Sequence, residues 1–187
     1  MRQIAVREAA VLLHTARRIM VIGCSGSGKS TLSRRICARF DLPYVSMDRD
    51  VFWLPGWVMR ERSDIVASVA AYADGDDWVF DGNNTETMPL RLRRADLVLW
   101  LAPPRLVSLF GAMKRIAGSY GEVRVDMAPG CPERIDFAFL RYIWNFNRLT
   151  APKMERVIEL NGAGVPVCVL KSHRAVNELL ALSGAGH

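Results

Sequence analysis

The chain has 187 residues, of which 50% are hydrophobic and 24% are charged, and its formal net charge is +6. This length and composition are typical of one globular domain and exclude a disordered or fibrous protein. The positive charge suits either nucleic acid or a site that holds several phosphates. Because no apolar run reaches the ~18 residues that span a bilayer and the first residues lack a signal-peptide core, we expect a cytoplasmic protein without a membrane partner.

The hydrophobic pattern predicts strands and helices that alternate along the chain. A leading helix is expected over residues 4–17, where apolar residues recur at helical spacing. Short apolar runs predict five strands, over residues 19–22, 44–47, 78–82, 97–101 and 165–170. In chain order, helices are expected between the first strand and residue 40, over 60–73, around 91–94, over 106–116, from 136 onward, and over 153–160 and 174–182. Nearly all-apolar strands that alternate with helices indicate a parallel sheet buried on both faces.

Two segments interrupt this alternation. Residues 51–57 are rich in aromatic side chains and contain a Pro-Gly turn signal, so we expect an irregular loop there. This loop either folds back on the core or forms the wall of an acceptor pocket. Residues 117–134 are rich in glycine and proline, which is typical of a mobile lid. We therefore expect one domain over residues 1–187, with an acceptor region at about 48–75 and a lid at about 117–134.

Residues 23–31 carry the clearest chemical signal. They read Gly-Cys-Ser-Gly-Ser-Gly-Lys-Ser-Thr, between a predicted strand and a predicted helix, which is the pattern of a P-loop. The backbone N–H groups of such a loop turn toward a polyphosphate. Lys29 would reach the β- and γ-phosphates of ATP, and the Ser30 hydroxyl would ligate Mg²⁺. We expect the phosphates to be bound by Gly23, Ser25, Gly26, Ser27, Gly28, Lys29, Ser30 and Thr31.

Aspartates follow two of the predicted strands. Because the carboxyl ends of parallel strands form the ligand-binding edge of an open sheet, Asp81 is a candidate to hold Mg²⁺ opposite Ser30. Its alternative role is that of an ordinary turn residue. Either Asp48 or Asp50 could accept the proton of an acceptor hydroxyl. Alternatively, Asp48 starts a turn and Asp50 pairs with an arginine, and the sequence leaves both alternatives open.

Several arginines are candidates to stabilise a transferring phosphoryl group, because the guanidinium fork donates two hydrogen bonds and keeps its charge. Arg115, Arg124 and Arg141 flank or occupy the predicted lid, and we take them as catalytic candidates. Arg91 follows the third predicted strand and is better placed for the acceptor.

Several motifs together resemble the FlaR-like "topology modulation" proteins, a branch of the adenylate-kinase-like P-loop kinases. The resemblance covers residues 19 to about 180, and its main motifs are the P-loop, Phe52-Trp53-Leu54-Pro55-Gly56-Trp57, Asp81-Gly82-Asn83 and Gly130-Cys131-Pro132-Glu133. It implies a three-layer α/β/α P-loop NTPase fold with a lid insertion and a five-stranded parallel sheet of order 2-3-1-4-5. It also implies that ATP binds at the P-loop, that Asp81 serves Mg²⁺, and that Arg115, Arg124 and Arg141 contact the phosphates.

The acceptor segments depart from those of adenylate kinases. Asp81-Gly82-Asn83-Asn84 stands where adenylate kinases have Asp-Gly-Phe-Pro-Arg, which disfavours AMP as the acceptor. The Asp48-x-Asp50 pair is similar to the Asp-x-Asp of shikimate-kinase-like enzymes, which handles a hydroxylated small molecule. We expect the acceptor to contact Asp48, Trp53, Trp57, Asn83 and Arg91.

Two functions follow from these observations. The first is an ATP- and Mg²⁺-dependent phosphotransferase that acts on a small molecule or a nucleotide. The alternative is a nucleotide-binding regulatory or DNA-topology-associated ATPase, which the family resemblance suggests and the basic charge permits. The sequence contains no zinc-finger spacing and no basic region with heptads that would support nucleic-acid binding.

Overall fold

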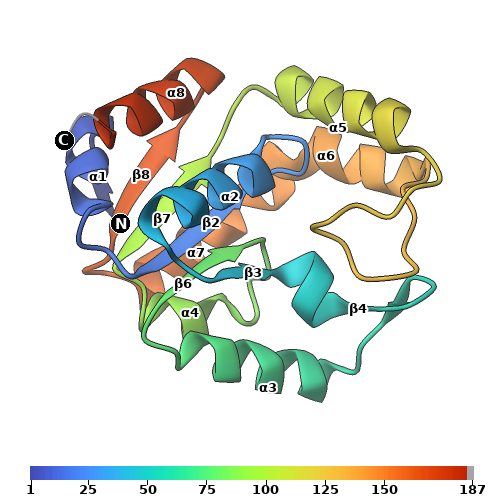
Figure 1. The fold of residues 1–187 in the computed structure, drawn as a ribbon, viewed down its shortest axis with the longest axis horizontal. Coiled ribbons are helices and arrows are strands. Elements are labelled where there is room, and N and C mark those ends of the chain that lie inside the picture. Colours follow the sequence, from blue (N-terminus) through green and yellow to red (C-terminus); the bar gives the residue numbers. More distant parts are fainter. Residues whose placement is uncertain (185–187) are drawn as a thin grey trace.

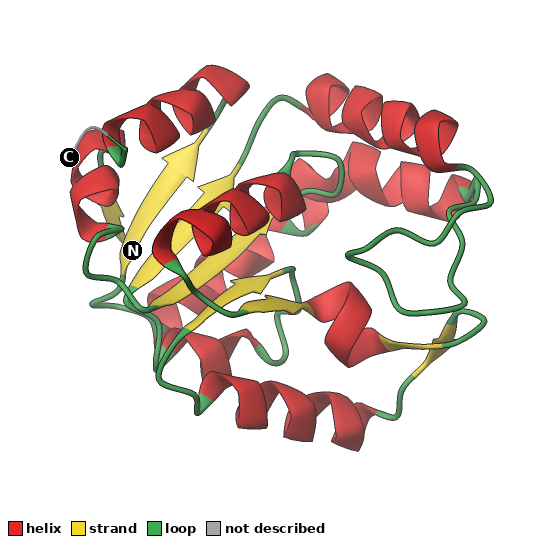
Figure 2. Ribbon diagram, viewed as in Figure 1, coloured by secondary structure: helices red, strands yellow, loops and turns green. Residues whose placement is uncertain are grey.

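A parallel sheet of six strands forms the centre of the computed structural model, which describes residues 1–184, and helices cover both faces of the sheet (Figures 1 and 2). In spatial order, the strands are β1 (Arg2–Ile4), β8 (Pro166–Leu170), β7 (Leu97–Leu101), β2 (Arg18–Gly23), β6 (Trp78–Asp81) and β3 (Tyr44–Ser46). The predicted order 2-3-1-4-5 corresponds to the run β3-β6-β2-β7-β8, so the three-layer α/β/α fold is confirmed.

The N-terminal segment differs from the prediction of one helix over residues 4–17. Helix α1 is shorter (Val6–Leu12), and the residues before it form β1, which pairs in parallel with β8. Without β1, strand β8 would present a row of unpaired backbone groups at the edge of the sheet. Periodicity alone missed this strand because only Ile4 of its three residues is buried.

The remaining helices are arranged in two layers around the sheet. They are α2 (Lys29–Phe40), α3 (Arg62–Ala73), α4 (Met88–Leu92), α5 (Arg105–Ser119), α6 (Phe137–Leu149), α7 (Ala151–Asn161) and α8 (His173–Leu182). Within residues 1–184, no helix is long and apolar enough to cross a membrane.

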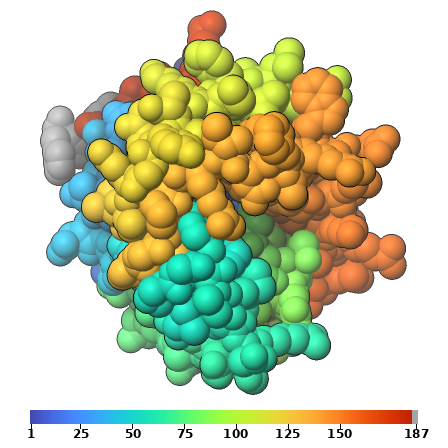
Figure 3. Space-filling view, turned by 90° about the vertical axis from the view of Figure 1, so that its right-hand side faces the viewer, coloured from blue at the N-terminus to red at the C-terminus, as the bar shows by residue number. Residues whose placement is uncertain are grey.

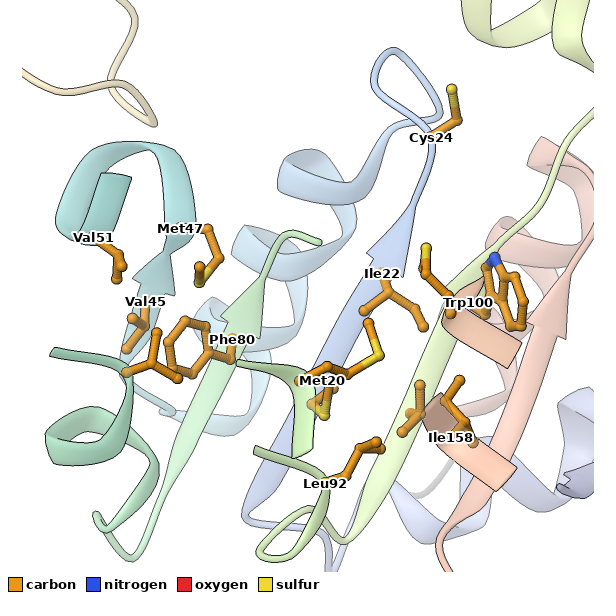
Figure 4. Packing of buried hydrophobic residues seen from close by; sticks show 14 of the residues in the cluster. Met20, Ile22, Cys24, Val45, Met47, Val51, Phe80, Leu92, Trp100 and Ile158 are labelled. Carbon is orange, nitrogen blue, oxygen red and sulfur yellow. The ribbon is translucent and has the colours of Figure 1, made fainter. Parts of the chain in front are cut away.

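The sheet separates two hydrophobic cores. Strand β2 contributes to both of them, because successive side chains of a strand point to opposite faces of the sheet. Ile19 and Val21 pack with residues of α1, α2 and α8 on one face. Met20 and Ile22 pack with residues of α3, α4, α6 and α7 on the other face. Figure 4 shows this second core, with Met20 and Ile22 beside Trp100 of β7.

The segment expected to be irregular around residues 51–57 contains regular structure. A short π-helical turn, η1 (Met47–Phe52), leads into an antiparallel hairpin of β4 (Trp53–Leu54) and β5 (Val58–Met59). The Pro-Gly signal lies at the turn of this hairpin, where Gly56 and Trp57 have φ values of 81° and 64°. The signal therefore marks a tight turn between two short strands rather than an irregular loop.

The predicted lid is a loop between α5 and α6 that packs against the hairpin. The loop starts later than predicted because α5 extends to Ser119. The backbone N–H of Gly56 donates to the Gly130 carbonyl at 3.0 Å, and the indole of Trp57 donates to the Pro132 carbonyl at 3.2 Å. Figure 3 shows the hairpin, in cyan, lying against the yellow and orange lid residues. The lid and the hairpin thus form one continuous wall.

Candidate active site

A cavity of about 530 Å³ lies at the carboxyl ends of β2, β3 and β6. Its walls come from the P-loop, η1, the hairpin, the lid and the start of α6. The predicted site residues that line it are Ser25, Gly26, Gly28, Lys29, Ser30, Thr31, Asp48, Trp53, Trp57, Asp81, Asn83, Arg115 and Arg124. This position is the edge at which open α/β sheets bind ligands.

The P-loop has the backbone shape that its glycines predict. Gly23, Gly26 and Gly28 have φ values of 140°, 77° and 96°, in the region that favours glycine. A Cβ added at Gly23 would lie 2.1 Å from the Leu101 carbonyl oxygen, and one at Gly26 would lie 2.1 Å from that of Ser108. The Lys29 ammonium donates to the Cys24 carbonyl at 3.0 Å, across the loop. The loop therefore provides a backbone cradle of the kind that accommodates phosphates.

Asn83 holds the start of the P-loop. Its Oδ1 accepts a hydrogen bond from the Gly23 N–H at 3.0 Å, and its Nδ2 donates to the Gly23 carbonyl at 2.7 Å. The sequence predicts instead that Asn83 contacts the acceptor. Although the residue lines the cavity, these two bonds already occupy both ends of its amide. The sequence carried no signal for this contact, which joins two loops that follow neighbouring strands.

We expect Asn83→Ala to weaken ATP binding about 10-fold, because it removes two hydrogen bonds that fix the first P-loop glycine. Titration of a fluorescent ATP analogue without acceptor measures this effect. Asn84→Ala is the matched control, since Asn84 Oδ1 accepts only from the N–H groups of Glu86 and Thr87 in its own loop. Unchanged ATP affinity together with a raised KM for the acceptor would contradict a role of Asn83 in the P-loop. It would mean that Asn83 contacts the acceptor.

Asp81 is buried at the end of β6 and has one free carboxylate oxygen. Oδ2 accepts a hydrogen bond from the Tyr44 hydroxyl at 3.0 Å, whereas Oδ1 has no hydrogen-bond partner within residues 1–184. Burial raises the pKa of Asp81, and the Lys29 ammonium opposes this rise. An oxygen without a partner beside a P-loop serine fits a hard cation such as Mg²⁺.

Asp48 and Asp50 have different environments, although one residue separates them. Both Asp50 oxygens bind the Arg49 guanidinium, at 2.7 and 2.8 Å, and Oδ2 also accepts from the Ser46 N–H. Asp50 does not line the cavity, and it takes the arginine-pairing role that the sequence left open. Asp48 lines the cavity and accepts no hydrogen bond within the described chain. The surrounding protein displaces water from the Asp48 carboxylate, which raises the pKa of Asp48. The positive charge of Lys29 opposes this rise.

Two arginines of the predicted set are held beside the P-loop by carboxylates that our sequence reasoning missed. Arg115 donates to the Ser25 hydroxyl at 3.2 Å and to Glu133 at 3.3 Å. Arg124 lies 2.6 Å from Glu133 and 3.1 Å from Asp126. Glu133 is buried and bridges both guanidinium groups. Glu133 belongs to the Gly-Cys-Pro-Glu motif, and this motif is the sequence signal that could have identified it.

Arg91 and Arg141 do not lie in the cavity, contrary to expectation. The Arg91 side chain is fully buried, donates to the Gly82 carbonyl at 2.9 Å and lies over the Phe80 ring. The short helix α4 turns this side chain inward against the end of β6. Arg141 is exposed on α6, because that helix presents Phe139 and Tyr142 to the cavity instead.

A solved structure shares this architecture. Shikimate kinase from Acinetobacter baumannii, in complex with shikimate, aligns over 95% of this chain and 99% of its own, with 11% identity and a TM-score of 0.57. The chain has the same fold as this shikimate kinase. A gluconokinase from Sinorhizobium meliloti 1021 aligns over 90% of this chain and 91% of its own, with 16% identity and a TM-score of 0.48. An uncharacterized protein from Eubacterium ventriosum ATCC 27560 aligns over 90% and 99%, with 10% identity and a TM-score of 0.47.

No family model matches the sequence, and no curated protein matches it either. At 11% identity, the alignment with shikimate kinase concerns the fold.

Proposed function

We propose that the protein is an ATP- and Mg²⁺-dependent phosphotransferase that transfers the γ-phosphoryl group of ATP to a hydroxyl of a small molecule. The observation that carries this proposal is the convergence of three groups in one cavity. They are the P-loop with Lys29, the carboxylate of Asp48 without a hydrogen-bond partner among the described residues, and the arginines bridged by Glu133. Membership of the FlaR-like group is part of the same proposal.

The donor side of the cavity is suited to hold ATP and its metal. The P-loop N–H groups and Lys29 bind the phosphates, and Ser30 and Asp81 are the residues that would hold Mg²⁺. When bound, Mg²⁺ neutralises charge on the phosphate oxygens. Arg115 and Arg124 orient the phosphoryl group and stabilise the charge that builds up on its oxygens.

The acceptor side supplies a base and a shaped wall. Asp48 accepts the proton of the acceptor hydroxyl as that oxygen forms a bond to the γ-phosphorus. The bond between the γ-phosphorus and the bridging oxygen breaks, and ADP leaves with that oxygen. Trp53 and Trp57, whose rings are 5.3 Å apart in an edge arrangement, wall off the cavity together with the lid. This wall keeps water, a competing acceptor, away from the phosphoryl group.

The direct test is incubation of the protein with ATP, Mg²⁺ and a library of hydroxylated metabolites, followed by mass spectrometry. We expect a phosphorylated acceptor and ADP in equal amounts. ATP binding without any phosphorylated product would contradict the proposal. ATP hydrolysis under the same conditions would then favour the ATPase alternative.

We expect Glu133→Gln to lower kcat about 100-fold with a smaller change in the KM for ATP, because two arginines lose the buried charge that positions them. Steady-state kinetics separates the two constants, and a melting curve reports the fold. Glu122→Gln is the control, since this lid glutamate is exposed. Loss of melting temperature in Glu133→Gln with an unchanged kcat would mean that the bridge is only structural.

A further inference from the structure

A second cavity of about 490 Å³ lies next to the first one. The two cavities share three lining residues, Phe52, Asn83 and Tyr142. The other walls of the second cavity come from the end of the hairpin, the first turns of α3 and the loop that follows Asn83. The second cavity therefore adjoins, at these three side chains, the cavity that contains Asp48.

Arg60 lines the second cavity and differs from the other arginines that are buried or half-buried in residues 1–184. Each of those donates to a carboxylate or a carbonyl oxygen, and they are Arg18, Arg49, Arg91, Arg94, Arg115 and Arg124. Arg60 is half-buried, its Nε is inaccessible to solvent, and its guanidinium has no hydrogen-bond or ion-pair partner in the same part of the chain. A cation that is partly withdrawn from water without a partner is unfavourable, and an anion would relieve this cost.

The neighbours of Arg60 complete a mixed polar and apolar site. Asn84 uses its Oδ1 to accept hydrogen bonds from the Glu86 and Thr87 N–H groups, which leaves its amide nitrogen available as a donor. Ile65 and Val66 of α3 form an apolar wall. Arg62 and Glu86 also line this cavity, and they pair with each other. Of the two arginines in the cavity, Arg60 is thus the one available to an anion.

We propose that the second cavity binds the anionic end of the acceptor, a carboxylate or a phosphate, through Arg60. The acceptor is then a hydroxylated acid or phosphate ester, long enough to place its hydroxyl at Asp48 in the first cavity. This inference rests on the proposed function for the position of the reacting hydroxyl. The anion site itself does not depend on phosphoryl transfer, because binding of the compound alone tests it.

Calorimetric titrations in the presence of Mg²⁺ and a saturating, non-hydrolysable ATP analogue test this site, because the P-loop is then filled. The probes are matched pairs that differ in one anionic group: shikimate and its methyl ester, gluconate and sorbitol, and AMP and adenosine. We expect at least one anionic member to bind at least about 10-fold more tightly than its neutral partner, as a charge-assisted hydrogen bond allows. The first two pairs report a carboxylate and the third reports a phosphate.

Arg60→Ala should abolish this preference without lowering the melting temperature, because the guanidinium has no partner to lose within the described residues. Arg93→Ala is the matched control, since Arg93 is exposed and lines neither cavity, and it should keep the preference. The inference is overturned if no anionic member binds more tightly than its neutral partner, or if Arg60→Ala keeps the preference. A preference that depends on Arg60, without phosphoryl transfer to any probe or library compound, would leave the anion site standing while the proposed function fails.

Discussion

We expect Lys29→Ala to abolish phosphoryl transfer, with a fall in kcat/KM of at least about 10³-fold, because it removes the cation that would face the β- and γ-phosphates. The fold should remain intact, since within residues 1–184 the Lys29 ammonium makes a single hydrogen bond, to the Cys24 carbonyl. A coupled assay for ADP measures the rate, and a thermal melt checks the fold.

Lys114→Ala is the matched control for this variant. Lys114 is exposed on α5 and does not line the cavity, so its removal changes the net charge by the same amount without touching the site. Its turnover should equal that of the wild type. Turnover near the wild-type rate in Lys29→Ala would refute the assignment of residues 23–31 as the ATP site.

Replacement of Asp48 with asparagine should reduce kcat by about 10²- to 10⁴-fold, the range over which a positioned base contributes. The amide keeps the size of the side chain but cannot accept the proton of the hydroxyl. Because the pKa of Asp48 is raised by its surroundings, the wild-type rate should fall as the pH drops through that raised pKa and protonates the base. Asp48→Asn should lose this acid limb from its profile of kcat against pH.

Asp50→Asn provides the contrast within the same turn. Asp50 does not line the cavity, and its carboxylate binds Arg49 and the Ser46 N–H, so the substitution should lower the melting temperature and largely spare kcat. If Asp50→Asn instead lost turnover while Asp48→Asn kept it, the roles of the two aspartates would have to be exchanged.

The core of the fold and the P-loop could be predicted from the sequence because both depend on local signals. A strand buried on both faces appears as a short apolar run, and five such runs lie in the predicted order in the sheet. The P-loop glycines occupy positions where φ is positive and a Cβ would collide with a neighbouring carbonyl oxygen, as at Gly23 and Gly26. Their spacing is therefore visible without any knowledge of packing.

The partners of the polar side chains depend on packing between segments that are far apart in the chain. Asn83 holds Gly23 across 60 positions, and Glu133 reaches back 18 positions to Arg115. The turn of η1 sends Asp48 into the cavity and Asp50 to Arg49, although a strand end with two aspartates predicts either. Packing between distant segments also turns Arg91 inward and leaves Arg60 without a partner within residues 1–184. The sequence identified the residue types at this edge of the sheet, while long-range packing determined which of them face the cavity.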